Sequence, residues 1–269
     1  MFFTSIKDIK MSGGGSSKSD GERVVLQKSV AHRLACDVRD LMRSPLSDEG
    51  IYYQHDQADM LKGYAMIVGP KDTVYEDGFY LFKFSFPTNY PYSPPTVSFI
   101  THDGKTRFHP NYYRSGKVCV SLLNTWRGDA WTGTQTIRSV LMTLCSLFDG
   151  EPLLNEPGVQ SSHPDVPRYK SIISFKNMQW SIIRQIKGLF MEGEGIPVLE
   201  PWVIETFGDG MKDIFLRNYE RIQEKVEANL SVDTIVTTRI YSLMQRVNWG
   251  PLKDELKELH EQLTIGKIE

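Results

Sequence analysis

The chain contains few cysteines, and their arrangement excludes two common kinds of site. Only Cys36, Cys119 and Cys145 occur in 269 residues. The number is odd and no two of them form a CxxC pair, which argues against both a disulfide framework and a zinc site. In a reducing compartment each of the three is a free thiol, so its reactivity depends on where it lies in the fold.

An excess of one charge and a long hydrophobic run are also lacking. The formal net charge of -2 at pH 7 gives no general electrostatic reason to bind nucleic acid or an anionic membrane. No uninterrupted apolar run approaches the roughly 20 residues that span a bilayer. The start MFFTSIKDIK has neither the long apolar segment nor the cleavage site of a secretory signal. We therefore expect a globular protein of the cytosol or the nucleus that binds neither nucleic acid nor a membrane.

Composition divides the chain into three predicted parts. Residues 1–22 include the small, polar and glycine-rich stretch MSGGGSSKSDGE and are predicted to form a flexible tail. Met11 opens that stretch and is a candidate alternative start. We predict a folded domain over residues 23–190 and a helical C-terminal extension over residues 191–269.

The predicted domain begins with a helix and continues with strands. Apolar residues recur every three or four positions between Val24 and Arg43, which is typical of an amphipathic helix. Strand-like runs follow at residues 63–70, 79–86 and 96–101. The proline, asparagine and glycine between these runs favour short antiparallel connections, and we expect a four-stranded meander in all.

Helical patterns dominate the second half of the domain. A largely apolar helix is predicted after Trp131, with Thr132 and Gln135 as the capping box at its start. This helix carries Cys145. Free cysteine is among the most buried residue types, so Cys145 and Cys36 are expected to be structural.

The remaining segments are also predicted to be mainly helical. A third helix is expected from Asp165 to about Phe190, followed by a connection at 191–210. Helices are then predicted at 211–230 and from Asp233 to about Asn248. A last helix has a heptad-like leucine stripe from Leu252 to Leu263, which either packs on its own domain or binds a partner. Because strands and helices are segregated, the pattern indicates the α+β class.

One stretch, FHPNYYRSGKVC at residues 108–119, contains a candidate reactive cysteine. Cys119 lies eight residues after Asn111 and ten after His109, in a segment that looks like a loop. A cysteine here can be a buried thiol, a metal ligand or a nucleophile. A thiol accepts an acyl group as a thioester that stays reactive toward amines, so it suits a carrier of activated carboxyl groups.

This stretch resembles the active-site loop of the ubiquitin-conjugating enzymes. In that family an HPN tripeptide precedes the active cysteine at the spacing seen between residues 109–111 and Cys119. The YPYSPP segment at 90–95 is similar to the family's YP-x-x-PP loop. The resemblance implies the family's α+β fold, with an N-terminal helix, an antiparallel four-stranded meander, a core helix and C-terminal helices.

Further features follow in the family's order. Trp131 precedes the predicted core helix, and an acidic-Pro-Leu step at residues 151–153 follows that helix. The resemblance covers roughly residues 24–190. The helical extension beyond it is an addition to the shared domain.

Within the family, the chain looks like the Z class. RSGKVCVSLLNTWRGDAW at 114–131 and NEPG at 155–158 resemble that class, which has a slightly lengthened loop after the cysteine and a helical C-terminal extension. Giant conjugating enzymes with ligase-like properties share parts of both stretches but have a longer insertion before the tryptophan. Trp126 and Trp131 flank this loop and are expected to pack against the core rather than to contact a modifier.

The resemblance implies a transferase. An activating enzyme would hand the C-terminal glycine of ubiquitin, or of a ubiquitin-like modifier, to Cys119. A substrate lysine or a ligase cysteine would then attack the thioester. The activating enzyme consumes the ATP, so no bound cofactor and no metal are expected. The alternatives are a non-catalytic ubiquitin-binding module of the same fold and a Cys–His hydrolase.

The resemblance also suggests roles for the neighbours of Cys119. The amide of Asn111 either stabilises the tetrahedral oxyanion or only braces the loop through backbone hydrogen bonds. His109, with Pro110, is expected to hold the loop rather than to transfer protons. Glu151 is the candidate for orienting the attacking lysine, against the alternative of a solvated loop carboxylate.

Two regions of the expected surface correspond to the family's docking sites. Tyr92 lies where the family meets ligases, but Gly133-Thr134 replaces the family's frequent Pro-Ala on the neighbouring loop and puts ordinary ligase binding in doubt. Arg23, Lys28 and Arg33 lie on or beside the predicted first helix, where the family docks its activating enzyme. Basic residues there also fit an ordinary solvated helix face.

Overall fold

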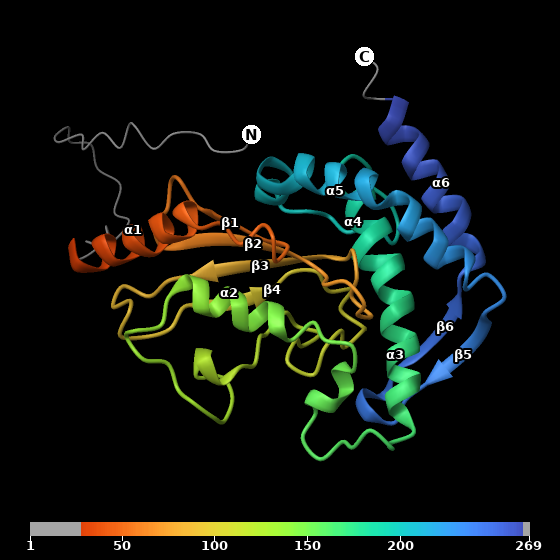
Figure 1. The fold of residues 1–269 in the computed structure, drawn as a ribbon, viewed down its shortest axis with the longest axis horizontal. Coiled ribbons are helices and arrows are strands. Elements are labelled where there is room, and N and C mark those ends of the chain that lie inside the picture. Colours follow the sequence, from red (N-terminus) through yellow and green to blue (C-terminus); the bar gives the residue numbers. More distant parts are fainter. Residues whose placement is uncertain (1–27, 266–269) are drawn as a thin grey trace.

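The computed structural model describes residues 28–265 of the chain. The predicted tail at 1–22, with Met11, lies outside these described residues. A four-stranded antiparallel sheet is flanked by helices, which confirms the predicted α+β class (Figure 1). On the right of that view, a separate two-stranded hairpin lies beside the helical rod formed by residues 165–187. Among the described helices, none combines the length and the apolar character needed to cross a membrane.

The long predicted third helix is continuous in space but changes its winding. Figure 1 shows it as one vertical rod, which consists of an α-helix, a π-helical segment and a last α-helical turn. The elements run in the order α1 (Lys28–Arg43), β1 (Ile51–His55), β2 (Lys62–Val68), β3 (Phe79–Ser85), β4 (Thr96–Phe99), η1 (Ser121–Leu123), α2 (Ile137–Ser146), η2 (Pro152–Asn155), α3 (Asp165–Lys176), η3 (Asn177–Arg184), α4 (Gln185–Lys187), α5 (Pro201–Glu227), β5 (Asp233–Thr237), η4 (Ile240–Ser242), β6 (Met244–Asn248) and α6 (Gly250–Ile265).

The sheet is the expected meander, with strand order β1-β2-β3-β4 and antiparallel pairing throughout. The three predicted runs correspond to β2, β3 and β4. The first strand, β1, was not located from the sequence. It is a five-residue edge strand in which only Ile51 is fully buried, so its hydrophobic pattern is weak.

The two inner strands bury both of their faces. Successive side chains of a strand point to opposite faces, so each inner strand contributes to two cores. Their facing residues across the sheet are held in register, as in the pair Ala65 and Phe82. The first core lies against α1 and α2. It contains the sheet residues Ala65, Ile67, Tyr80, Phe82 and Phe84 and the α2 residues Ile137, Val140, Leu141 and Leu144.

The C-terminal extension covers the opposite face of the sheet. Figure 1 shows α5 and α2 on opposite sides of the strands. The second core joins the strands to η3, α5 and α6, and Tyr64 stacks on Trp202 with ring centroids 4.3 Å apart. Its sheet residues are Tyr64, Met66, Phe79 and Leu81.

The leucine stripe of α6 packs within this second core. Leu252, Leu256 and Leu259 are at most 2% exposed. Glu255 on the same helix forms ion pairs with Arg184 at 3.3 Å and Lys187 at 2.8 Å. Of the two alternatives for the stripe, packing on its own chain is therefore the one observed.

Part of the extension differs from the prediction, because residues 233–248 form a β-hairpin and not a helix. β5 pairs with β6 from Asp233 opposite Asn248 to Thr237 opposite Met244. The segment DTIVT is rich in β-branched residues, which lose side-chain freedom in a helix and fit a pleated strand. The apolar spacing predicts a helix here, and that prediction is wrong because the branched side chains favour paired strands.

The connection predicted at 191–210 is also shorter than expected. α5 begins at Pro201 in the first helical turn, where proline's fixed φ angle suits a helix and its missing N–H is not needed. The prediction of a connection over 191–210 rests on the glycine, proline and acidic residues of this stretch, which include Gly208. Gly208 instead lies inside the helix close to Leu189, where even a methyl group would touch the leucine side chain at 3.6 Å.

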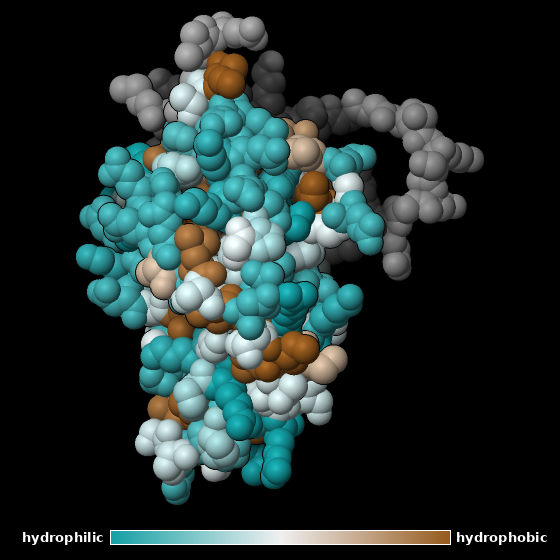
Figure 2. Space-filling view, turned by 90° about the vertical axis from the view of Figure 1, so that its right-hand side faces the viewer, coloured by the Kyte–Doolittle hydropathy of each residue, from teal (hydrophilic) through white to brown (hydrophobic). Residues whose placement is uncertain are grey.

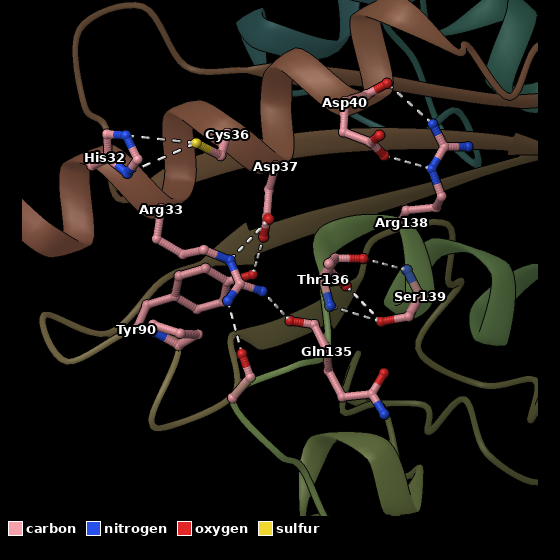
Figure 3. Close-up of polar contacts among 12 residues, drawn as sticks. His32, Arg33, Cys36, Asp37, Asp40, Tyr90, Gln135, Thr136, Arg138 and Ser139 are labelled. Carbon is pink, nitrogen blue, oxygen red and sulfur yellow. Dashed lines mark hydrogen bonds and ion pairs between the residues drawn. The ribbon is translucent and has the colours of Figure 1, made fainter.

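The start of α2 also differs from the prediction. Its capping box is formed by Thr136 and Ser139, not by Thr132 and Gln135. Arg33 of α1 explains the shift, because its guanidinium donates hydrogen bonds to the carbonyls of Gly133 at 2.7 Å and Gln135 at 2.5 Å (Figure 3). Those carbonyls point at Arg33 and are not available for an earlier helical turn.

Arg33 belongs to a cluster that ties α1 to the loop before α2. Its guanidinium also pairs with Asp37 at 3.0 Å. The carboxylate of Asp37 is 6% exposed and accepts a hydrogen bond from the Tyr90 hydroxyl. Burial and this bond to Asp37 raise the pKa of Tyr90 above its ordinary range, so its hydroxyl stays a donor. Arg33 is therefore not simply part of a solvated basic face.

We predict that Arg33→Ala lowers the free energy of unfolding by about 1–3 kcal/mol, because a buried carboxylate and two carbonyls lose a charged donor. Hydrogen exchange of residues 131–136 should also become faster. Denaturant unfolding and amide exchange measure the two effects. Arg39→Ala is the matched control, since Arg39 is an exposed arginine of the same helix and its loss should stay within about 0.5 kcal/mol. Equal losses in both variants would contradict the prediction.

Candidate active site around Cys119

Cys119 lies on the wall of a small pocket. The residue as a whole is 3% exposed, and the pocket has a volume of about 250 Å³. That volume is below the roughly 300–1,000 Å³ of small-molecule sites, and it suits a side chain or an extended segment of chain. The pocket is lined by residues from the loop before Cys119, the loop after it, the segment after η2 and the turn between β5 and β6.

The backbone on both sides of Cys119 is fixed by Thr125. The Thr125 hydroxyl accepts a hydrogen bond from the N–H of Val120 at 2.9 Å and donates to the carbonyl of Val118 at 3.0 Å. The N–H of Cys119 itself donates to the carbonyl of Asn111 at 2.9 Å. The thiol is thus carried on a rigid segment.

Asn111 holds this segment from the other side. Its side-chain amide nitrogen donates to the carbonyl of Cys119 at 2.5 Å. Together with the Cys119 N–H bond, this closes a reciprocal pair between the two residues. The bracing role is therefore present in the resting structure. An amide nitrogen carries two hydrogens, so this bond occupies only one of its donors.

His109 is fully buried and lies below the loop. Its Nδ1 accepts a hydrogen bond from the N–H of Asn111 at 3.0 Å, which leaves the ring proton on Nε2. Burial, aided by the charge of Arg107, lowers the pKa of His109 to about 3. The ring is neutral near pH 7, and among the described residues it shares no hydrogen bond with Cys119. This geometry favours the loop-holding role and gives no support to a Cys–His nucleophile pair.

Arg107 holds the carbonyls of the HPN tripeptide. Its guanidinium donates to the carbonyl of His109 at 3.2 Å and to that of Pro110 at 2.5 Å. It lies 3.3 Å from the ring centroid of Tyr113, a cation–π contact. The carbonyl of Arg107 accepts a bond from the Tyr169 hydroxyl. No local sequence pattern distinguishes Arg107, because its contacts to the two carbonyls and to Tyr113 arise only when the loop folds back on itself.

Glu151 does not lie among the residues that line the pocket. Its carboxylate is about half exposed and pairs with Lys170 at 2.6 Å. The structure thus brings Asn111, Pro110 and Cys119 together and leaves Glu151 outside.

A different carboxylate lines the pocket. Glu156 follows η2 and accepts a hydrogen bond from the hydroxyl of Tyr241, which comes from the C-terminal extension. Sequence reasoning missed both residues. The NEPG stretch indicates only the class of the enzyme, and Tyr241 lies within a segment predicted to be helical.

The two tryptophans that flank the loop after Cys119 differ in their burial. Trp131 is 7% exposed and donates its ring N–H to the carbonyl of Pro91, as expected for a packed residue. Trp126 is 47% exposed and lines the pocket, so the expectation that it packs in the core is wrong. Tyr92 is 84% exposed on the YPYSPP loop.

The other two cysteines lie away from the pocket. Cys145 is partly buried in α2, and burial raises the pKa of its thiol. Cys36 is partly exposed on α1 beside His32, with sulfur and ring nitrogen 3.8 Å apart (Figure 3). Within residues 28–265, no group of three or more His, Cys, Asp or Glu side chains is placed to hold a metal ion.

Comparison with known proteins identifies the domain that carries Cys119. The sequence model of the ubiquitin-conjugating enzyme family matches residues 33–172. Ubiquitin-conjugating enzyme E2 Z of Homo sapiens is 41% identical over 176 residues, which cover 64% of this chain and 49% of that protein. The E2 Z of Danio rerio is 42% identical over 159 residues, which cover 58% of this chain and 48% of that protein.

A giant relative is also similar. The dual E2 ubiquitin-conjugating enzyme/E3 ubiquitin-protein ligase BIRC6 of Homo sapiens is 36% identical over 173 residues, covering 58% of this chain and 4% of that protein. The chain spans about half the length of the E2 Z proteins it matches. These similarities confirm the predicted resemblance and its assignment to the Z class.

The burial of neutral His109 predicts a pH dependence of stability. Because the folded-state pKa of about 3 lies below the unfolded value of about 6.5, the unfolded state binds more protons below that value. The stability that neutral His109 contributes to the folded state is complete above about pH 6.5 and is lost as the pH falls toward about 3. We expect the slope from His109 to approach about 1.4 kcal/mol per pH unit in acid.

The measurement compares His109→Gln with the parent protein by denaturant unfolding between about pH 7.5 and about pH 5, above the main range of carboxylate titration. The variant is expected to be less stable at neutral pH but to show a flatter dependence on pH. Parallel curves for the two proteins would show that His109 does not titrate as expected.

Proposed function

The chain belongs to the ubiquitin-conjugating enzyme family, and from that premise we propose that it accepts ubiquitin or a ubiquitin-like modifier on Cys119. The modifier would arrive from an activating enzyme and leave for a substrate lysine or a ligase. The observation that carries the proposal is the position of Cys119. It lies at the family's spacing from the HPN tripeptide and on the wall of a pocket, with its backbone fixed on both sides.

The proposed reaction consists of two acyl transfers. In the first, the Cys119 sulfur attacks the thioester carbonyl of the modifier on the activating enzyme. A new C–S bond forms and the activating enzyme's thiol departs. In the second, a lysine nitrogen attacks, a C–N bond forms and the C–S bond to Cys119 breaks. The amine loses a proton and the departing thiolate takes one up, so no cofactor is needed on this chain.

Asn111 can serve both of the roles considered from the sequence. One of its two amide hydrogens is committed to the carbonyl of Cys119. The other can be directed at the oxyanion that forms when the thioester is attacked, without loss of the brace. Loss of one such donor typically costs about 10²–10³ in rate. His109 takes no part in proton transfer in this mechanism, since it is neutral and bonded to the backbone.

The proposed partners follow from the family. They are ubiquitin or a ubiquitin-like modifier, an activating enzyme, protein substrates and a ligase, encountered in the cytosol or the nucleus. The exposed ring of Tyr92 is available to a ligase, while Arg33 is engaged within the chain. The second candidate, a non-catalytic ubiquitin-binding module, is less favoured because a cysteine lies in the pocket at the catalytic spacing.

We predict that incubation with an activating enzyme, ATP and ubiquitin gives an adduct that reducing agents cleave, and that Cys119→Ala abolishes it. Non-reducing gel electrophoresis measures the adduct. Cys36→Ala and Cys145→Ala are the matched controls, since both thiols lie outside the pocket. Both controls should charge at the parent rate.

The same assay distinguishes the alternatives. Ubiquitin that binds without a covalent adduct would favour the binding module. An adduct that survives in Cys119→Ala but not in Cys36→Ala would overturn the assignment of the cysteine. Repetition with each activating enzyme and each ubiquitin-like modifier identifies what is carried.

A further inference from the structure

The C-terminal extension returns to the candidate active site. The β5–β6 hairpin packs beside α3 (Figure 1). The turn between its strands reaches the pocket that Cys119 lines. Tyr241 of this turn lines the pocket. A segment more than 100 residues away in sequence from Cys119 therefore forms part of its surroundings.

The turn is fixed by a buried carboxylate at the start of α3. Asp165 is 1% exposed, and one of its oxygens accepts hydrogen bonds from the N–H groups of Arg239 at 2.8 Å and Ile240 at 2.9 Å. The side chain of Arg114, in the loop of residues 108–119 that leads to Cys119, donates a hydrogen bond to the carbonyl of Tyr241. The turn is thus bonded both to a helix of the domain and to the loop that carries Cys119.

The backbone of this turn adopts a conformation that side chains disfavour. Tyr241 and Ser242 have φ angles of 63° and 48°, in the left-handed region where non-glycine residues are uncommon. Such a conformation persists only where the surrounding contacts hold it. The consequence is that the Tyr241 side chain is directed at the pocket wall.

The side chain of Tyr241 makes contacts that define its orientation. Its hydroxyl donates to the carboxylate of Glu156. Its ring lies 5.0 Å from the Arg107 guanidinium and 6.0 Å from the ring of Tyr169. Burial and the bond to Glu156 raise the pKa of Tyr241 above its ordinary range, so the hydroxyl remains a donor.

Glu156 is thereby held in the pocket with its charge available. Among residues 28–265 it receives the bond from Tyr241 but forms no ion pair, whereas Glu151 outside the pocket is paired with Lys170. Within the described part of the chain, Arg107 supplies the one guanidinium that lines the pocket, and it is directed at the carbonyls of His109 and Pro110. A carboxylate of this kind can bind an ammonium group beside the thioester.

Building on the proposed function, we propose that Glu156 receives and orients the attacking lysine, and that Tyr241 of the extension positions Glu156 for this task. The ammonium binds the carboxylate and gives up its proton there, from where the proton passes to water. The free nitrogen then attacks the carbonyl on Cys119 and a C–N bond forms. The nitrogen loses its second proton to water as the C–S bond breaks. The departing thiolate takes a proton from solvent. Glu156 is the catalytic residue in this step, and Tyr241 acts through it.

The test uses the full chain charged with ubiquitin on Cys119, freed of activating enzyme and ATP, and then mixed with free lysine or with hydroxylamine. Glu156→Gln keeps the shape of the side chain and removes its charge, and it should slow discharge to lysine by about 100-fold. Tyr241→Phe keeps the ring and removes the donor, and it should slow this discharge by about tenfold. Glu156→Asp should restore part of the rate.

Hydroxylamine is the control nucleophile because it is already unprotonated at neutral pH. Both variants should discharge to it, and should charge with ubiquitin, at the parent rate. A structural defect in the pocket would slow charging, discharge to lysine and discharge to hydroxylamine together. That result would contradict a role of Glu156 that is specific to the protonated lysine. Saturation with lysine separates KM from kcat, and the proposal expects KM for lysine to rise in Glu156→Gln.

Two outcomes would overturn the proposal without affecting the proposed function. One is unchanged lysine discharge in Glu156→Gln. The other is lysine discharge that is slowed in Glu151→Gln and not slowed in Glu156→Gln. That result would assign the orienting role to Glu151, as the sequence suggests. Failure of the parent chain to form any thioester on Cys119 would instead refute the proposed function itself.

Discussion

The burial of both faces of strands β2 and β3 is the constraint on which the rest of the structure depends. One face forms the core with α1 and α2, and the other forms a second core with η3, α5 and α6. Each buried aliphatic or aromatic side chain contributes on the order of 1.5–3 kcal/mol. Both layers are therefore needed to cover the sheet, and the extension is part of the folded unit rather than an attachment to it.

The same packing positions the active loop. The rings that lie beneath the loop belong to the first core, and two of them hold its backbone directly, since Tyr75 donates to the carbonyl of Phe108 and Tyr169 to that of Arg107. Buried His109 then supports the N–H of Asn111, which in turn holds Cys119. The thiol is thus connected to the core through a short chain of hydrogen bonds.

Sequence reasoning found what depends on local patterns. The HPN tripeptide, its spacing to Cys119 and the main helices of the domain are encoded in contiguous stretches, and so is the meander apart from β1. It failed where a distant partner decides the outcome. The start of α2 is set by Arg33, which is some 100 residues earlier in the chain. Glu156 and Tyr241 become neighbours only because a hairpin replaces the expected helix.

The face of the molecule that carries the hairpin and α6 is largely hydrophilic, with apolar side chains scattered across it (Figure 2). The sheet face that η3 and α5 cover is different. It carries Tyr64, Met66, Phe79 and Leu81, all on two adjacent strands. A chain trimmed to the matched region of residues 33–172 would present this apolar surface to water. The choice of expression boundaries thus decides whether a recombinant fragment is soluble. A fragment that aggregates through its exposed sheet would be inactive for that reason, and its inactivity would say nothing about its catalytic residues.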